Sequence, residues 1–511
     1  MPTFKDYTMA QLQLPLSFED FIPENHLVRV VNTVVECLDL KPLYDRYKEG
    51  GCPAYHPKMM LKVMIYSFSQ KTYSSRQIAK SLRENINFMW IAGGNKPDFR
   101  TINRFRLDMK DVIEDVLYEV VKLLIEKKYI KLQNYFLDGT KIEANANKYT
   151  FVWNKAVGNY DRKLDEKIKN HLREIDRIVA EENEIYLEDD LEETGVNSRI
   201  TTGQVEGVVK SIDKKLAKNP MDKKLKKKAK EFKKDILPRK QKYEEAFAIF
   251  EGRNSYSKTD HDATFMRMKE DAMLNGQLKP GYNVQIGTEN RYIVGFTIHP
   301  NPTDTKTMIP HLKHLEKRLG RLPENIVADA GYGSEENYEY LEEKNLGSYV
   351  KYNKFHWEKK KKNRENPYLT DNLPYIAETD RFVCRNGKQL LHIGNRKYVT
   401  EAGYETRRDY YRCEDCTGCP YATECKNTDK NRTIMVSHRL NELKRKANAN
   451  LCSKRGHKLR SQRVVEVEQV FGRIKGCWSF RRFHLRGADK VKIEWGLLAI
   501  AHNIAKMALE G

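Results

Sequence analysis

Two short apolar runs that each end in an aspartate constrain the fold of this chain more than any other sequence feature. Tyr135-Phe136-Leu137 leads into Asp138-Gly139, and Asn325-Ile326-Val327-Ala328 leads into Asp329-Ala330-Gly331. Aromatic and aliphatic runs of this length, bounded by turn-forming residues, are typical of buried β-strands. The ends of paired strands lie only about 5 Å apart. The two runs therefore predict a sheet that brings Asp138 and Asp329 together from distant parts of the chain.

The strand pattern resumes at Tyr282 and predicts a mixed α/β sheet. Residues 282–288 and 292–298 have the pattern of a hairpin, with the turn at Glu289-Asn290. A helix follows, with Thr303 or Asp304 as its N-cap, and residues 348–352 form a last strand. The predicted order is strand, insertion, hairpin, helix, strand, helix, strand.

Residues 25–125 are predicted to be mainly helical. Pro57 can open one helix, Ser74 or Ser75 can cap a second, and residues 97–106 offer a third with a basic face. The second helix turns apolar residues inward and basic residues outward, namely Ile78, Leu82 and Ile86 against Arg76, Lys80 and Arg83. Short helices with exposed Arg and Lys suit a DNA-binding module. The alternative is an ordinary helical bundle with a solvated basic face.

Residues 155–252 are charged and helical in pattern, and we interpret them as an insertion. Apolar residues recur every three or four positions and predict two narrow seams. The first seam is Leu164, Ile168, Leu172, Ile175 and Val179, and the second is Val205, Val209, Ile212 and Leu216, extended by Leu225, Phe232 and Ile236. The lysine-rich stretch 214–234 could touch phosphate, but a solvated helix face is the favoured interpretation.

Composition points to a polyanionic partner. The 511 residues carry 92 Lys and Arg against 71 Asp and Glu, a formal charge of +21, which favours nucleic acid over an anionic membrane surface. The length suggests about three structural units. No signal peptide is expected in Met1 to Leu27, and no apolar run reaches the roughly 18 residues of a membrane span. We expect a cytosolic protein whose nine cysteines are free thiols or metal ligands.

Five of the cysteines lie within one segment and suggest a metal site. Cys413, Cys416, Cys419 and Cys425 are closely spaced, with Cys384 upstream as an alternate ligand. Four thiolates can hold a structural Zn²⁺ tetrahedrally, but loose thiols or redox pairing remain open. The isolated cysteines are expected to be core residues: Cys37, Cys52, Cys452 and Cys477.

A helix predicted near the C-terminus offers a third carboxylate. Glu468 and Lys475 are seven residues apart, so both side chains lie on one helix face. If Glu468 joins Asp138 and Asp329, three hard oxygen ligands suit Mg²⁺ or Mn²⁺. Two ions about 3.5–4 Å apart would support phosphodiester displacement. A lone aspartate at a strand end is more often a cap or turn former, so the three are informative only together.

Three motifs resemble the catalytic motifs of the DDE transposases of bacterial insertion sequences. They are residues 137–146, residues 328–334 and residues 467–475, and the likeness extends to 281–285, 480–483 and the helical segment 97–105. The resemblance implies an RNase H-like catalytic domain in which Asp138, Asp329 and Glu468 hold two Mg²⁺ or Mn²⁺ ions. It also implies metal-dependent cleavage at transposon ends and transfer of the 3′-OH end into target DNA. A similar cysteine-rich insert occurs in one branch of the family.

The chain departs from the family pattern ahead of Glu468. Many relatives carry an Arg four residues and a Tyr seven residues before the Glu, where this chain has Val464 and Ser461. Arg463 is one position off and is assigned the phosphate-contacting role. Spacing alone also allows Glu466 as the acid. Lys475 is expected to contact DNA phosphate, and its alternative is a salt bridge with Glu468.

The predicted fold class is α/β, an RNase H-like mixed sheet with inserted segments, preceded by an all-α domain. The predicted boundaries are 1–125 for the helical DNA-binding domain, 126–154 and 259–354 for the catalytic domain, 155–258 for the charged helical insert, 355–435 for the cysteine-rich insert and 436–511 for the C-terminal helices.

The predicted function is that of a DNA transposase acting on double-stranded DNA, both transposon ends and target. We expect a homodimer on DNA, because two ends must be brought together, in the bacterial cytosol and associated with the nucleoid. One alternative is a metal-dependent nuclease of the same fold that cuts without joining. The other is a domesticated, non-catalytic DNA-binding protein.

Overall fold

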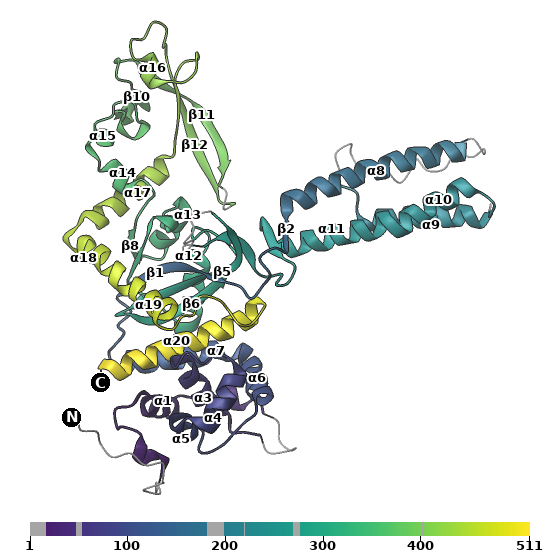
Figure 1. Ribbon diagram of the computed structural model, residues 1–511. Coiled ribbons are helices and arrows are strands. Elements are labelled where there is room, and N and C mark those ends of the chain that lie inside the picture. Colours follow the sequence, from purple (N-terminus) through teal and green to yellow (C-terminus); the bar gives the residue numbers. More distant parts are fainter. Residues whose placement is uncertain are drawn as a thin grey trace, which may run out of the picture. The chain divides into compact units, whose positions relative to one another are not determined.

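The computed structural model describes residues 17–47, 54–180, 199–218, 220–268, 276–400 and 403–510 (Figure 1). The chain divides into two compact units. The first comprises Met1–Ile142, Asn283–Leu485 and Asp489–Gly511, and the second comprises Glu143–Tyr282 and Arg486–Ala488. Cys52 lies outside the described residues, as do the side chain of Val179 and most of the stretch between the two predicted seams.

The first unit contains the predicted mixed sheet. The sheet follows the order β4-β5-β1-β7-β8, with β4 at Thr264–Arg267, and β6 also pairs with β5. Strands β5 and β6 form the antiparallel hairpin, and β7 pairs parallel with both β1 and β8. The predicted order of elements is confirmed: β1 (Asn134–Glu143), β5 (Leu278–Glu289), β6 (Tyr292–His299), α12 (Met308–Leu319), β7 (Asn325–Ala328), α13 (Glu335–Glu343) and β8 (Gly347–Val350).

The hairpin turn lies one residue later than predicted. Glu289 pairs with Tyr292, which leaves Asn290 and Arg291 as the turn, both in the left-handed region with φ of 51° and 59°. A two-residue turn of this hand matches the twist of the flanking strands. Glu289 stays in the strand because its carboxylate accepts backbone N–H groups, including that of Leu132, from the segment entering β1.

The predicted cap of α12 is wrong. The helix begins at Met308 with Thr307 as its N-cap. Asp304 lies three residues earlier, and its carboxylate accepts hydrogen bonds from Asn283 and Gln285 of β5. Those contacts hold the side chain away from the helix terminus.

The helices that precede the sheet include the three that were predicted individually, at Pro57, at Ser74 or Ser75 and over 97–106. In chain order, the described helices before the sheet are α1 (Leu27–Glu36), α2 (Lys41–Tyr44), α3 (Pro57–Ser69), α4 (Ser75–Glu84), α5 (Ile86–Ile91), α6 (Phe99–Asp108) and α7 (Ile113–Glu126). Pro57 opens α3, which is almost wholly buried. Ile86 does not extend α4, because the Asn85 side chain accepts the backbone N–H groups of Asn87 and Phe88 and starts a new helix there.

The C-terminal helix α20 (Ala488–Glu510) is in contact with both the sheet and the N-terminal helices. Its Asn503 side chain exchanges two hydrogen bonds with the backbone of Ile293 in β6. On α7, Ile113 comes so close to Gly496 that a Cβ there would collide with it. No helix within the described residues is long and apolar enough to span a membrane.

Glu494 of α20 is a fully buried acid. One carboxylate oxygen accepts the backbone N–H groups of His484 and Leu485 at 2.8 and 3.1 Å. The other lies 3.9 Å from the guanidinium of Arg106 on α6. Burial raises the pKa of Glu494 to about 7, because a charged carboxylate loses its hydration there.

The second unit is built mainly from the predicted helical insert. Helix α8 (Asn154–Ala180) lies alongside α9 (Thr202–Lys218), α10 (Lys223–Glu231), the π-helical turn η3 (Phe232–Ile236) and α11 (Leu237–Phe250) in one arm (Figure 1). Strands β2 (Phe151–Trp153) and β3 (Ser255–Ser257) pair where the chain enters and leaves this arm. Both apolar seams are confirmed in its core, with Leu216 only partly buried.

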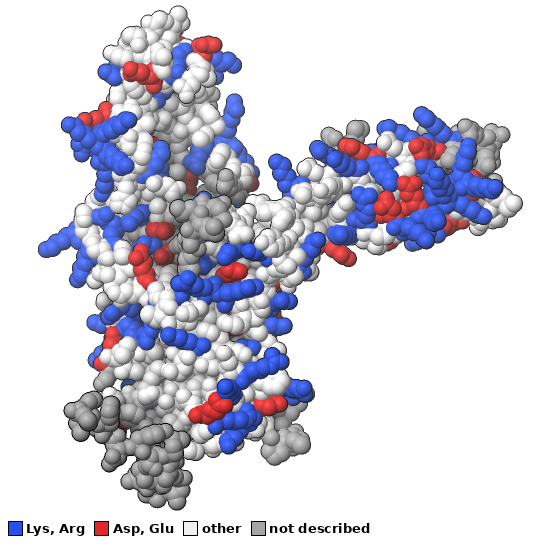
Figure 2. Space-filling view, viewed as in Figure 1, with Lys and Arg blue, Asp and Glu red and all other residues white. Residues whose placement is uncertain are grey.

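Charges of both signs alternate along the arm (Figure 2). In the lysine-rich stretch, Lys228 pairs with Glu174 and Lys233 with Asp213. These pairs favour the solvated-face interpretation. Lys240 of α11 is different, because it is fully buried and its ammonium contacts Asp161 at 2.7 Å and Asp165 at 2.6 Å.

The cysteine-rich segment forms a sheet of its own in the first unit. Its antiparallel order is β13-β12-β11-β10-β9, with β9 at Tyr375–Ile376, β10 at Arg381–Val383, β11 at Gln389–Val399, β12 at Glu405–Cys413 and β13 at Thr433–Val436. The prediction that the isolated cysteines are core residues is wrong for Cys37, Cys452 and Cys477, which are exposed. Each lies at the end of a helix, where the chain turns toward solvent.

The buried cation of the arm gives a stability test. Lys240→Met leaves Asp165 without its cation and Asp161 with Arg199 alone, so we expect the free energy of unfolding to fall by about 3 kcal/mol. Guanidinium denaturation followed by circular dichroism measures the change. Lys233→Met removes a half-exposed pair and serves as the control, with an expected change below about 1 kcal/mol. Equal effects of the two substitutions would contradict the assignment.

Glu494 predicts a specific pH dependence. Because its pKa in the folded protein is raised from 4.5 to about 7, the folded state binds more protons than the unfolded state between these pH values. The stability contribution of Glu494 therefore falls as pH rises from about 4.5 to 7, by on the order of 3 kcal/mol. Glu494→Gln keeps an acceptor for the two N–H groups but cannot titrate. Denaturation of both proteins across this range should show the wild type losing stability relative to the variant as pH rises, and parallel curves would refute the shift.

Candidate active site

The sheet register sets Asp138 and Asp329 side by side. Asp329 directly follows β7, as predicted, but the prediction that Asp138 ends its strand is wrong, because β1 continues to Glu143. Asn134, Tyr135 and Phe136 pair in parallel with Asn325, Ile326 and Val327. Two further steps along this ladder bring Asp138 opposite Asp329. Adjacent strands are about 4.8 Å apart, so the two carboxylates share one end of the strand pair.

Arg463 bridges the two aspartates. Its Nη2 atom lies 3.1 Å from Oδ1 of Asp138 and 3.4 Å from Oδ2 of Asp329. The Arg463 side chain is only 11% exposed and that of Asp138 only 9%. Two adjacent carboxylates repel each other, and a cation between them offsets that repulsion. Arg463 is the last residue of α18 (Lys454–Arg463).

A π-helical turn determines the direction in which the Glu468 side chain points relative to Arg463. Residues Val464–Glu468 form η7, which directly follows Arg463. Residues five apart in an α-helix point about 140° away from each other, whereas a π-turn closes its hydrogen bonds between residues five apart. The extra residue in the turn therefore returns Glu468 toward the helix face that carries Arg463. This accounts for an arginine five positions before the acid where four was expected.

Glu468 itself is exposed and stands apart from the two aspartates. It makes no hydrogen bond or ion pair with any residue that the structure describes. Glu466, the other acid that the spacing allowed, accepts the backbone N–H of Arg291 at the hairpin turn at 2.5 Å. Burial raises the pKa of Glu466. Glu466 therefore stabilises the turn, and Glu468 is the acid left available on this helix.

Lys475 reaches the strand that carries Asp138. Its Nζ atom donates to the backbone carbonyl of Lys141 at 3.1 Å. Lys475 lies within η8 (Arg473–Cys477), a second π-helical turn, which follows α19 (Gln469–Gly472). The alternative salt bridge to Glu468 is not formed among the described residues.

Preformed metal sites are absent from the described part of the chain. No group of three or more His, Cys, Asp or Glu side chains there is arranged to hold a metal ion. Asp138 and Asp329 therefore come together without Glu468. The predicted zinc ligands do not form such a group among the described residues either, namely Cys413, Cys416, Cys419 and Cys425, with Cys384 as the alternate.

Three of the cysteines are placed by packing and by Arg432. Burial, followed by the neighbouring Cys416, raises the pKa of the Cys413 thiol to about 12. The sulfur of Cys416 accepts the backbone N–H of Arg432 at 3.4 Å, and that of Cys425 accepts its guanidinium at 2.9 Å. Cys384 and Cys416 also pack against the core of the second sheet.

A buried polar network next to the aspartates was missed by sequence reasoning. Gln285 donates to Asp304 at 2.8 Å and to Asn283 at 3.0 Å, and Asn283 donates to Asp304 at 2.7 Å. The hydroxyl of Tyr332, three residues after Asp329, donates to the side-chain amide oxygen (Oε1) of Gln285. Burial keeps the pKa of Tyr332 well above its usual range, so the hydroxyl remains a donor.

This network fills the space between β1, which carries Asp138, and the turn that follows Asp329. A Cβ at Gly139 would collide with Gln285 and lie 2.5 Å from Oδ1 of Asp304. A Cβ at Gly331 would lie 3.5 Å from the other oxygen of Asp304. The available sequence signal was the pair Asn283 and Gln285, two polar residues on one face of a buried strand.

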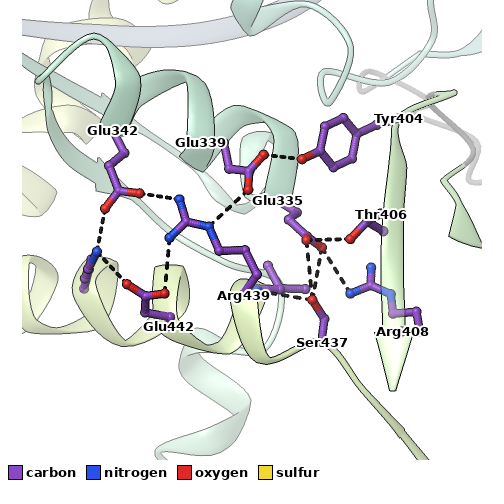
Figure 3. Close-up of polar contacts among 11 residues, drawn as sticks. Glu335, Glu339, Glu342, Tyr404, Thr406, Arg408, Ser437, Arg439 and Glu442 are labelled. Atoms are coloured by element: carbon purple, nitrogen blue, oxygen red, sulfur yellow. Dashed lines mark hydrogen bonds and ion pairs between the residues drawn. The ribbon is translucent and has the colours of Figure 1, made fainter. Parts of the chain in front are cut away.

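Three acids of α13, Glu335, Glu339 and Glu342, are already paired, as Figure 3 shows. Glu335 contacts Arg408 at 3.1 Å, Thr406 at 2.7 Å and the hydroxyl of Ser437. The remaining pairs join Glu339 to Tyr404, and Glu339 and Glu342 to Arg439. These contacts fasten β12 and the start of α17 (His438–Cys452) to α13. A hollow of about 860 Å³ lies over them. The carboxylates of Glu335 and Glu339 that line it are occupied by these structural contacts.

The polar network gives a double-mutant test. Gln285→Ala leaves the Tyr332 hydroxyl buried without an acceptor and Asp304 with one donor fewer, so we expect a loss of about 3 kcal/mol in unfolding free energy. Tyr332→Phe should cost about 1 kcal/mol, and the double variant should cost at least about 0.5 kcal/mol less than the sum. Tyr338→Phe is the control, because its hydroxyl bonds to the Val350 carbonyl instead. Additive effects of Gln285→Ala and Tyr332→Phe in denaturation would contradict the network.

Two family models match the chain. One, described as Transposase DDE domain, matches residues 383–508, a range that includes strands β11 to β13 of the cysteine-rich sheet, Arg463, Glu468 and Lys475. The other, described as Transposase domain (DUF772), matches residues 16–108, which include helices α1 to α6. No curated protein and no solved structure gives a significant match. Together the two matches indicate a DDE-type transposase of an insertion sequence.

Proposed function

We propose that this transposase cleaves DNA at the ends of its element and joins the freed 3′-OH to target DNA, using Asp138, Asp329 and Glu468. The observation that carries the proposal is the β1–β7 register, which sets Asp138 against Asp329 with Arg463 bridging both. The mixed sheet, with a hairpin on one side and parallel strands on the other, is compatible with an RNase H-like catalytic domain.

The two aspartates fit a divalent cation by the chemistry of their donors. Mg²⁺ is usually bound through one or two carboxylates together with substrate phosphates and water, so two hard oxygen donors on adjacent strands are enough to begin such a site. When bound, paired ions activate the attacking oxygen and stabilise the leaving one. We assign Asp138, Asp329 and Glu468 as the residues that hold them.

We assign Arg463 and Lys475, which flank Glu468 in the sequence, to contacts with the DNA. Arg463 already lies at the two aspartates, and its Nε atom has no partner within the described residues, so the guanidinium can also meet a phosphate. Lys475 lies against β1 three residues beyond Asp138. Both side chains would hold the DNA strand next to the carboxylates. Glu468 has no hydrogen-bond or ion-pair partner among the described residues, so no such contact with them has to break when substrate arrives.

The proposal also covers the wider assembly. The N-terminal helices would bind the transposon ends, and a homodimer on DNA would bring two ends together. The net charge of +21 supports a DNA partner.

The catalytic assignment is tested by a single isosteric change. Asp329→Asn removes one carboxylate charge while keeping the shape, so cleavage of end-containing DNA in Mg²⁺ should fall on the order of a thousandfold. DNA binding should remain. A labelled 3′-OH end detects joined product in the same assay.

Glu343→Gln is the matched control, because this acid on α13 is exposed and lies outside the site. It should cleave and join as the wild type does. Unchanged activity of Asp329→Asn would refute the site, and wild-type cleavage without joined product would refute strand transfer.

A further inference from the structure

We propose that a basic groove between α4 and α6 binds a backbone phosphate of double-stranded DNA. The proposal rests on the DNA-binding part of the proposed function and assigns it a site. The groove encloses about 580 Å³, and the residues that define it here are Ser75, Arg76, Arg100, Arg104, Arg106 and His484.

The groove carries charge of one sign. Four arginines from two helices line it, and none of its described lining residues is an aspartate or glutamate. The hollow over α13 is lined instead by both signs, including Glu335 and Glu339. Arg106 lies 3.9 Å from the buried Glu494, so the other three arginines around the hollow are the cations that favour an anionic ligand.

Two buried polar groups line the groove without a partner. Arg106 is 5% exposed and donates to the Tyr73 carbonyl at 3.1 Å and to Asn103 at 2.8 Å. Its Nε atom has no hydrogen-bond partner within the described residues, and neither has the hydroxyl of Ser75, which is 9% exposed. Unpaired buried donors are costly, so their presence here indicates a site built for a polar ligand.

The N-terminus of α4 opens into the same groove. Ser74 is the N-cap of this ten-residue helix, and no side chain caps its first turn. Ser74 and Ser75 both line the groove. Uncapped N–H groups and the positive end of the helix dipole favour a phosphate group.

An aromatic ring holds two of the arginines at the rim. The guanidinium of Arg76 lies 5.0 Å from the centre of the Phe99 ring, and that of Arg100 lies 5.8 Å from it. Phe99 is 37% exposed. The ring therefore restrains the side chains of α4 and α6 next to each other, so a phosphate meets arginines that are already ordered.

The groove also includes part of the segment that follows η8, the turn that contains Lys475. His484 directly follows Phe480-Arg481-Arg482-Phe483, the downstream motif. Tyr73 fixes this segment, since its hydroxyl donates to the Trp478 carbonyl at 2.8 Å and its ring lies 5.2 Å from that of Phe480. DNA held in the groove would thus contact both the N-terminal helices and the chain just after Lys475.

The test measures the binding of labelled end-containing duplex DNA to the full chain by fluorescence anisotropy over a range of salt concentrations. Arg104→Ala should weaken binding about tenfold and reduce the slope of log K against log salt by about 1, as the loss of one phosphate contact requires. Ser75→Glu, which places a negative charge in the groove, should weaken binding at least as much.

Lys80→Ala is the matched control, because Lys80 is exposed on the same helix but does not line the groove. It should change neither affinity nor slope, and circular dichroism checks that all variants fold. If Arg104→Ala and Ser75→Glu bind as the wild type does, the groove is refuted while DNA binding stands. If Lys80→Ala loses as much as Arg104→Ala, only general charge is involved and the groove is again refuted. If the wild type binds no DNA, the proposed function fails first, and the groove with it.

Discussion

The contact of Arg463 with Asp138 and Asp329 is the constraint on which the described site depends. The parallel pairing of β1 and β7 brings two carboxylates side by side, where their like charges repel each other. A cation delivered from α18 relieves this repulsion and at the same time docks the helix on the edge of the sheet. The arginine therefore couples an electrostatic requirement of the sheet to the placement of the helix that carries Glu468 and Lys475.

Around this contact, hydrogen-bonded polar side chains fill the space between the strands and the loops and fix their positions. Gln285 and Asp304 lie where a larger residue at Gly139 would have to go, and Tyr332 ties the loop after Asp329 to the same strand. Glu289 and Glu466 each accept backbone N–H groups near the ends of β5 and β6. Hydrogen bonds to carboxylates are stronger than those between neutral groups, so a few acids suffice to fix the loops of a basic chain.

Periodicity predicted the backbone well and the side-chain roles less well. The hairpin, the order of strands and helices and the two seams of the helical arm all follow from apolar spacing, because burial of one face determines each of them. The role of Asp304 did not follow, since the choice between a helix cap and a partner on β5 depends on tertiary contacts. The end of β1 was also misplaced, because a glycine after Asp138 indicated a turn, whereas here it makes room for Gln285. The π-turn after Arg463 leaves no periodic signal over so few residues.

The pairing of β2 with β3 has a consequence for how the sheet assembles. Asp138 and Asp329 are about 190 residues apart, and strands so distant pair slowly because the intervening loop must close first. The β2–β3 ladder joins Trp153 to Ser255, so a folded arm removes about a hundred residues from that loop. The entropy saved is only about 0.6 kcal/mol for each halving of a loop. The larger benefit concerns timing. If the arm folds by itself during synthesis, the β2–β3 pairing brings the two ends of the arm together before β7 has been synthesised.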